Sequence, residues 1–207
     1  MDSGEISASF DSLYVAAELD EAYGGVTRPE VQILAYLSCL LSVYEGNPRT
    51  IWGYRFTATG DVVPESETLT SSLMRLQSAG LLSMAASEKY RITSAGKEEL
   101  EMWKRLRQFK KRIPYLRGAT GTAVALPLPA VGDGVSQEPQ LANSASLNSP
   151  RELLDEVGRS ALYRQFRVLR EALGDDVLDL MVPGVVWLTY LLEEESGEMA
   201  DSHGGIK

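Results

Sequence analysis

The residues best suited to binding chemistry lie in the run WKRLRQFKKRIPYLR, residues 103–117. No acidic residue occurs between Met102 and Gly132, and the run holds seven cations: Lys104, Arg105, Arg107, Lys110, Lys111, Arg112 and Arg117. Clustered cations bind phosphates and carboxylates, so the run predicts a helix that contacts a nucleic-acid backbone or an acidic protein. The interleaved aromatic residues leave a second interpretation equally open, in which a core helix buries its rings and presents a solvated basic face.

The residue types disfavour catalytic chemistry. The only histidine, His203, lies close to the end of the sequence, and the only cysteine, Cys39, lies in an apolar run where a small buried side chain is expected. A Ser-His-Asp site, a Cys-His site and a His-ligated metal would all lack their histidine in the core. Three carboxylates could gather a hard cation, but they also suit a helix N-terminus and are interpreted as caps: Asp175, Asp176 and Asp179. We therefore expect a non-enzymatic protein with no cofactor and no metal.

Charge is distributed unevenly along the 207 residues, which carry a net charge of −9. Residues 1–30 and 149–207 each carry −6, whereas residues 102–148 carry +5. An acidic chain does not attract polyanions in general, so any nucleic-acid contact must come from a local basic patch. Alternatively, the acidic ends could fold against the basic run, where exposed ion pairs would set orientation more than strength.

The start of the sequence, MDSGEISASF, is acidic and lacks the apolar stretch of a signal peptide. A single cysteine provides no disulfide framework, which favours a reducing cytoplasm. The most apolar run, residues 177–192, contains Asp179 and Pro183 and is short for a bilayer span. We expect a cytoplasmic protein without a membrane contact.

Helix and strand signals predict a mainly α fold with a small β-hairpin. A helix is predicted over residues 8–23, and Thr27 with Glu30 forms a capping box that opens a second helix, apolar on nearly every side, through Tyr44. Residues 47–56 are ambiguous and are interpreted as a short helix that runs into a strand.

The central part of the chain gives clearer signals. A helix is predicted from Ser66 to Ala79, with Gly80 as its left-handed C-cap. Residues 81–84 and 89–93 predict two strands of a hairpin, after which Thr93 caps a helix of about five turns that ends near Ile113.

The stretch LMRLQSAGLLSMAASEKYRITSAGKEEL, Leu73–Leu100, resembles the wing segment of PadR-like and MarR-like winged-helix proteins. In those families an RL…GLL…YRIT..G run recurs, with the last glycine, here Gly96, in the first turn of the following helix. The resemblance is looser over residues 27–113 and absent elsewhere. It implies a winged helix-turn-helix domain, and winged helices serve both DNA reading and protein assembly.

If the family pattern holds, Ser66–Ala79 is the recognition helix. The resemblance carries five residues onto that role: Ser66, Thr68, Ser71, Ser72 and Arg75. Glu65 and Glu67 depart from the needs of a DNA reader, because they stand where phosphates would come, and residues 64–92 hold as many acids as bases. The chain before the helix is also longer than a tight helix-turn-helix connection.

The last third is predicted as a linker followed by a separate helical unit. Residues 118–148 are rich in Gly, Pro and Ser, which predicts a flexible linker, and residues 196–207 are expected to be a disordered tail. Within 149–195, Ser149–Glu152 reads as a capping box that opens a helix from Pro150 to Leu173, followed by a shorter helix after Pro183. The first helix presents an apolar face that could pack back on the winged helix, form the seam of a homodimer or insert into a partner protein: Leu154, Val157, Ala161, Leu162, Phe166, Leu169 and Leu173.

Together these features predict a winged-helix domain over residues 1–117 that acts as an accessory or adaptor subunit of a multi-protein complex. The basic run and the C-terminal apolar helix would be its contacts with another protein subunit. In architecture alone, the chain is similar to small acidic winged-helix subunits that accompany large ATPases in bacterial chromosome handling and phage defence. The alternative is a winged-helix transcription regulator, dimeric through its long helices, that binds DNA through a local basic helix.

Overall fold

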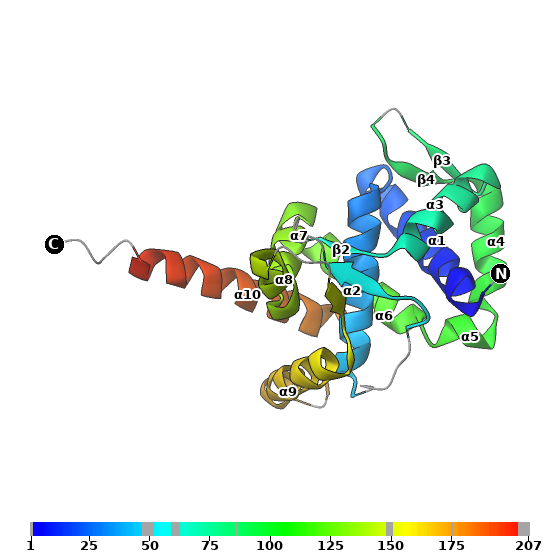
Figure 1. The fold of residues 1–207 in the computed structure, drawn as a ribbon. Helices are drawn as coiled ribbons and strands as arrows, with labels where there is room; N and C mark the ends of the chain where they lie inside the picture. Colours follow the sequence, from blue (N-terminus) through cyan, green and yellow to red (C-terminus); the bar gives the residue numbers. More distant parts are fainter. Residues whose placement is uncertain are drawn as a thin grey trace.

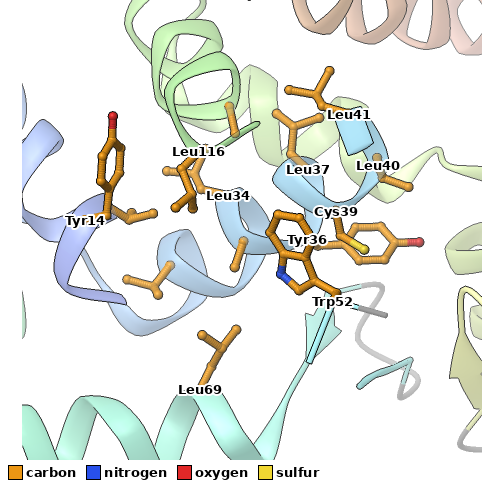
Figure 2. Packing of buried hydrophobic residues seen from close by; sticks show 14 of the residues in the cluster. Tyr14, Leu34, Tyr36, Leu37, Cys39, Leu40, Leu41, Trp52, Leu69 and Leu116 are labelled. Atoms are coloured by element: carbon orange, nitrogen blue, oxygen red, sulfur yellow. The ribbon is translucent and has the colours of Figure 1, made fainter. Parts of the chain in front are cut away.

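The most deeply buried helix, α2 (Arg28–Tyr44), forms the centre of the computed structural model of this chain (Figure 1). The structure describes residues 2–46, 52–58, 63–85, 87–147, 151–174 and 176–202. The predicted capping box is confirmed, because the Thr27 hydroxyl accepts from the Glu30 N–H and the Glu30 carboxylate accepts from the Thr27 N–H. Figure 2 shows the α2 side chains packed among residues from other helices, including Leu69 and Leu116.

The first helix, α1 (Ser3–Tyr23), starts five residues before the predicted residue 8. Asp2 and Glu5 form a second capping box that sets this earlier start. The helix ends at Gly24, whose φ of 65° is left-handed. α1 packs against α2 and also against α3 (Glu67–Ser78), β4 (Tyr90–Ile92), α4 (Ser94–Lys104) and α6 (Ile113–Ala125).

The predicted helix–hairpin–helix order is confirmed. Helix α3 (Glu67–Ser78) is followed by strands β3 (Leu82–Met84) and β4 (Tyr90–Ile92), which pair antiparallel, and then directly by α4 (Ser94–Lys104). Gly80, at φ 72°, closes α3: its N–H bonds to the Gln77 carbonyl, and the next N–H bonds to the Leu76 carbonyl. Thr93 caps α4 by accepting from the Gly96 N–H at 3.0 Å.

A further backbone pair joins this hairpin to the segment between α1 and α2. Val26 and Tyr90 exchange two hydrogen bonds, of 3.0 and 2.8 Å, in an antiparallel bridge. The hairpin is therefore attached along one edge to the chain between the first two helices.

The basic run is not one helix, contrary to the prediction. α4 ends at Lys104, a single turn follows as α5 (Arg107–Lys110), and α6 (Ile113–Ala125) begins after it. The bends let Phe109 stack on Phe10 of α1, with ring centroids 4.3 Å apart, and bring Arg112 to Asp11. Burial of a ring and pairing of a buried charge outweigh continuation of the helix.

A small antiparallel sheet, absent from the prediction except for part of its first strand, lies beside α2. Its strands are β1 (Phe56–Ala58), β2 (Pro64–Glu65) and β5 (Arg151–Leu153), in the order β2-β1-β5. Residues 47–51, where a short helix was predicted, lie outside the described residues. The helix predicted from Pro150 begins instead at Glu156, because 151–153 pair with β1 and Asp155 serves as the cap, accepting from the Gly158 N–H.

The linker prediction is wrong over 118–147. These residues continue α6 and form α7 (Leu128–Ser136) and α8 (Pro139–Leu147), and they bury Ala119, Ala123 and Val131. The small residues that suggested flexibility instead allow close helix packing. A Cβ on Gly118 would lie 2.7 Å from the Leu180 Cβ, and one on Gly184 would lie 2.4 Å from the Thr122 Oγ1.

The last two helices, α9 (Glu156–Leu173) and α10 (Met181–Ser202), share the hydrophobic core of the first part of the chain and do not form a separate segment. α10 packs on α6 and α7, and its C-terminal half then leaves the body of the molecule (Figure 1). The predicted disordered tail is helical through Ser202, and residues 203–207, which include His203, lie outside the described residues. Among the described residues, no helix is long and apolar enough to cross a membrane.

The prediction of a mainly helical fold with a β-hairpin is thus confirmed at that level of detail, with a second small sheet in addition.

Candidate functional site

Four of the seven predicted contact cations gather around the single turn of α5 and are exposed. This α5 cationic surface consists of Arg105, Arg107, Lys110 and Lys111. Within the described part of the chain, none of the four forms an ion pair, although six other cations do. Four like charges without counter-charges repel one another, so they favour an anionic ligand.

Apolar groups lie within the α5 cationic surface. Leu106 is 47% exposed and Met102 is 55% exposed, although both are large hydrophobic residues. An open depression of about 500 Å³ is lined by Leu106, Arg107, Gln108 and Lys111. The surface therefore offers cations and an apolar contact side by side.

Lys104 and Arg117 are set apart from this surface by their contacts. The Lys104 Nζ lies 2.9 Å from Glu101 and 5.4 Å from the ring centroid of Tyr14. Arg117 is exposed and interacts with the Tyr14 hydroxyl; burial, followed by the charge of Glu18, still raises the pKa of Tyr14 to about 12.

Arg112 was predicted as a contact cation, and the structure corrects this: its guanidinium lies inside the protein. It binds both carboxylate oxygens of the fully buried Asp11, with Nε 2.8 Å from Oδ1, and donates to the Trp52 carbonyl at 2.6 Å. The guanidinium also lies 4.0 Å from the Trp52 ring centroid. The aromatic residues interleaved in the run indicated that one side of it is buried. They did not indicate that Asp11 would pair with Arg112.

Tyr54 completes this buried network. Its hydroxyl donates to the Asp11 Oδ2 at 2.5 Å and accepts from the Trp52 indole N–H at 3.0 Å. Burial raises the pKa of Tyr54, and the Asp11 charge raises it further, so the phenol stays protonated and keeps donating. Burial alone would lower the pKa of Arg112, but the Asp11 carboxylate outweighs burial and holds it above its ordinary value. The network joins α1, the Trp52–Tyr54 segment and the start of α6.

The candidate recognition helix α3 presents few of the predicted contact residues. Ser72 is fully buried and Ser66 is buried, with the Ser66 backbone held from both sides by the Gln32 amide. Arg75 pairs with Glu5 at 3.0 Å. The exposed stripe of α3 instead contains Glu67, Ser71, Met74 and Ser78, while Thr68 is half-buried. The buried Ser66 and Ser72 side chains are therefore not available as groove contacts in this structure. Arg75, whose side chain is 37% exposed, is engaged by Glu5, and its role as a groove contact stays a prediction.

The predicted partner face of the C-terminal helix is mostly part of the core. Leu162 and Phe166 are buried, and the Phe166 ring lies between Tyr44 and Trp187, with centroid distances of 5.7 and 5.2 Å. Leu154 is also buried and precedes the helix. Ala161, Leu169 and Leu173 are half-buried, and only Val157, at 77% exposure, is open to solvent among the seven residues.

The cysteine and the aspartates considered in the sequence analysis have structural roles where the structure describes them. Cys39 is buried, which raises the pKa of its thiol to about 12. Asp179 accepts from the Met181 N–H at 3.0 Å at the start of α10, so its interpretation as a cap is confirmed. Asp175 lies outside the described residues. Among those residues, no three His, Cys, Asp or Glu side chains gather in a way that could hold a metal ion.

Glu138 was missed by the sequence analysis, since it lies in the supposed linker. Its carboxylate is buried and accepts from Tyr36, from the Gln140 N–H and from the Leu141 N–H, each at 3.1 Å. Burial raises the pKa of Glu138, although these hydrogen bonds act in the opposite direction. A glutamate directly before Pro139 at a helix start was the available signal.

The raised pKa of Glu138 predicts a pH dependence. The folded state binds this proton more tightly than the unfolded state, so the stability that this group contributes is present at acidic pH and is lost as pH rises through the folded-state pKa. We therefore expect the free energy of unfolding of the Glu138→Gln variant, relative to that of the unmodified protein, to be higher at pH 7 than at pH 4. Urea unfolding of both proteins at the two pH values measures this difference. A difference that does not change between the two pH values would contradict the raised pKa.

No family model, curated protein or solved structure matches this chain. The resemblance of Leu73–Leu100 to winged-helix wing segments therefore stays a prediction.

Proposed function

We propose that this chain is a non-enzymatic adaptor subunit whose α5 cationic surface binds an acidic segment of a partner protein. The observation that carries the proposal is the gathering of Arg105, Arg107, Lys110 and Lys111 around an exposed Leu106, without ion pairs in the described part of the chain. On a chain of net charge −9, such a cluster is an isolated positive region that would attract an anionic partner.

The chemistry of this surface favours a protein over a duplex. A nucleic-acid backbone offers phosphates at every step, and affinity for it grows with the number of cations that can reach them. The α5 cationic surface is compact and contains exposed Leu106 and Met102, which an acidic peptide with apolar side chains would cover. Covering those two side chains would add apolar burial to charge pairing.

A DNA-binding regulator is the second candidate, and the order of elements favours it. α1, the Val26 bridge, α2, α3, β3 and β4 come in the order of a winged helix, with β1 and β2 inserted between α2 and α3. In that arrangement α3 would enter the major groove and the hairpin would be the wing. Against it, the exposed stripe of α3 carries Glu67, and Arg75, the one cation of α3, is engaged by Glu5. The α5 turn also lies at the end of α4 away from the hairpin (Figure 1), so the cations do not supplement α3.

Charge reversal tests the proposed function. We expect Arg107→Glu with Lys111→Glu to weaken binding of the partner by about tenfold or more, because two attractive contacts become repulsive. The matched control is Arg28→Glu with Lys97→Glu, which changes the net charge equally at two exposed positions on other helices. The measurement is capture of partners by the tagged full chain in its own host, with and without nuclease, quantified by mass spectrometry.

The two candidates give different results in this experiment. A near-stoichiometric protein that survives nuclease, is retained by the control and is lost with the α5 variant supports the adaptor. DNA capture that nuclease abolishes, with a steep salt dependence in a duplex titration, would instead support the regulator. Equal capture by both variants would reject the α5 cationic surface as the contact.

A further inference from the structure

A pocket of about 380 Å³ lies where α2, β1, β5 and the start of α9 meet. Its wall contains three aromatic residues, Trp52, Tyr54 and Phe56, and the small side chain of Cys39. Figure 2 shows Trp52 and Cys39 next to each other. A concave site of this size, with an apolar wall and a few polar groups, is typical of small-molecule binding.

The aromatic wall offers ring surface more than polar groups. The Trp52 indole N–H donates to the Tyr54 hydroxyl, and this hydroxyl donates to the Asp11 carboxylate, so both groups are engaged in the buried network. Phe56 has no polar side-chain atom. Rings of this kind pack favourably against a flat aromatic body.

Arg159 of α9 lines the same pocket and has no counter-charge. The residue is half-buried, and its buried Nε has no hydrogen-bond partner in the described part of the chain. Arg159 also forms no ion pair with any described residue. Burial raises the pKa of the Cys39 thiol, and the charge of Arg159 is among those that oppose this rise. A buried donor without an acceptor is costly, and a guanidinium is best satisfied by a carboxylate that accepts two of its N–H groups.

The other charged residues of the pocket are exposed and therefore lie at its opening. Arg55 and Glu152 pair with each other at 3.2 Å. Asp155 and Glu156 lie at the start of α9, where Asp155 accepts from the Gly158 N–H at 2.7 Å. Acids near the opening would repel a second negative charge on a ligand, so a monoanion suits the pocket better than a phosphate.

We propose that this pocket binds a small aromatic carboxylate, with its carboxylate on the Arg159 guanidinium and its ring against Trp52 and Phe56. The carboxylate supplies the acceptor that the Arg159 Nε lacks, and the aromatic wall covers the apolar body of the ligand. The site is separate from the α5 cationic surface, because no residue of that surface lines the pocket.

Calorimetric titration of the full chain with benzoate, 2-naphthoate and indole-3-carboxylate tests this site. At least one of these probes should bind with a dissociation constant of about 1 mM or below, and its neutral amide should bind at least about tenfold more weakly. In NMR spectra of the ¹⁵N-labelled protein, the Nε–H signal of Arg159 should shift on binding. The Arg159→Lys variant, which lacks this signal, assigns it.

Arg159→Gln should weaken binding by about tenfold or more, because the ligand loses its counter-charge. It should not lower the midpoint of thermal unfolding, since no described acid loses a partner. The matched control is Arg164→Gln, at an exposed position of the same helix outside the pocket, and it should bind as the unmodified protein does. Arg107→Glu with Lys111→Glu should also bind normally, which separates this pocket from the α5 cationic surface.

Two kinds of result would overturn the proposal. One is the failure of all three carboxylates to bind, or equal binding by the Arg159→Gln variant. The other is binding of phenyltrimethylammonium in place of the carboxylates, because the exposed acids and the rings would then select a cation.

Discussion

Replacing Arg112 by Ala is expected to lower the free energy of unfolding by about 3–5 kcal/mol, the range found when one partner of a buried ion pair is removed. Asp11 is fully buried and binds the Arg112 guanidinium through both of its oxygens. Without Arg112, this carboxylate would keep only the Tyr54 hydroxyl as a described side-chain donor, and the Trp52 carbonyl would lose its donor as well. The measurement is urea unfolding at neutral pH.

The matched control for Arg112 is Arg105→Ala, a change at an exposed cation of the same run. It should alter the unfolding free energy by no more than about 0.5 kcal/mol, as is usual for surface sites without specific partners. Arg105→Ala should instead weaken capture of the partner, although the variant stays fully folded. An Arg112→Ala variant as stable as the control would mean that the Asp11 pair does not hold the three segments together.

Phe166→Ala is expected to lower the free energy of unfolding by about 3–5 kcal/mol, because it removes a ring buried between two others and leaves a cavity. The Phe166 ring contacts Tyr44 of α2 and Trp187 of α10. Its removal therefore takes away contacts that join α9 to two helices far from one another in the sequence. Phe166→Asp should prevent folding altogether, because it would also bury a charge without a partner.

Val157→Ala is the control for Phe166 on the same helix. Val157 belongs to the same predicted face but is 77% exposed, so its truncation should change stability by no more than about 0.5 kcal/mol. Thermal and urea unfolding of both variants measure the contrast. Equal, small effects at Phe166 and Val157 would mean that α9 is not packed on the core, and would restore its apolar face as a candidate contact for a partner.

Short-range signals in the sequence determined several elements of this protein by themselves. The Thr27–Glu30 capping box, the Gly80 C-cap and the Thr93 cap are arrangements of backbone and side chain within a few residues, so residue type and spacing are enough to specify them. The hairpin between α3 and α4 was specified in the same way, by two short β-prone stretches with a turn between them. The unusual share of apolar residues in α2 likewise predicted its burial.

Only the tertiary structure decided which of the predicted contact residues are exposed and which are buried. Arg105 and Arg112 are the same residue type seven positions apart, yet one faces solvent and the other binds Asp11, about a hundred residues away in the chain. Composition also misrepresented residues 118–147, because Gly and Ser permit flexibility in a linker and close approach between packed helices alike. The physical reason is common to these cases: a cap depends on neighbours in sequence, whereas burial depends on partners that the chain brings together only when it folds.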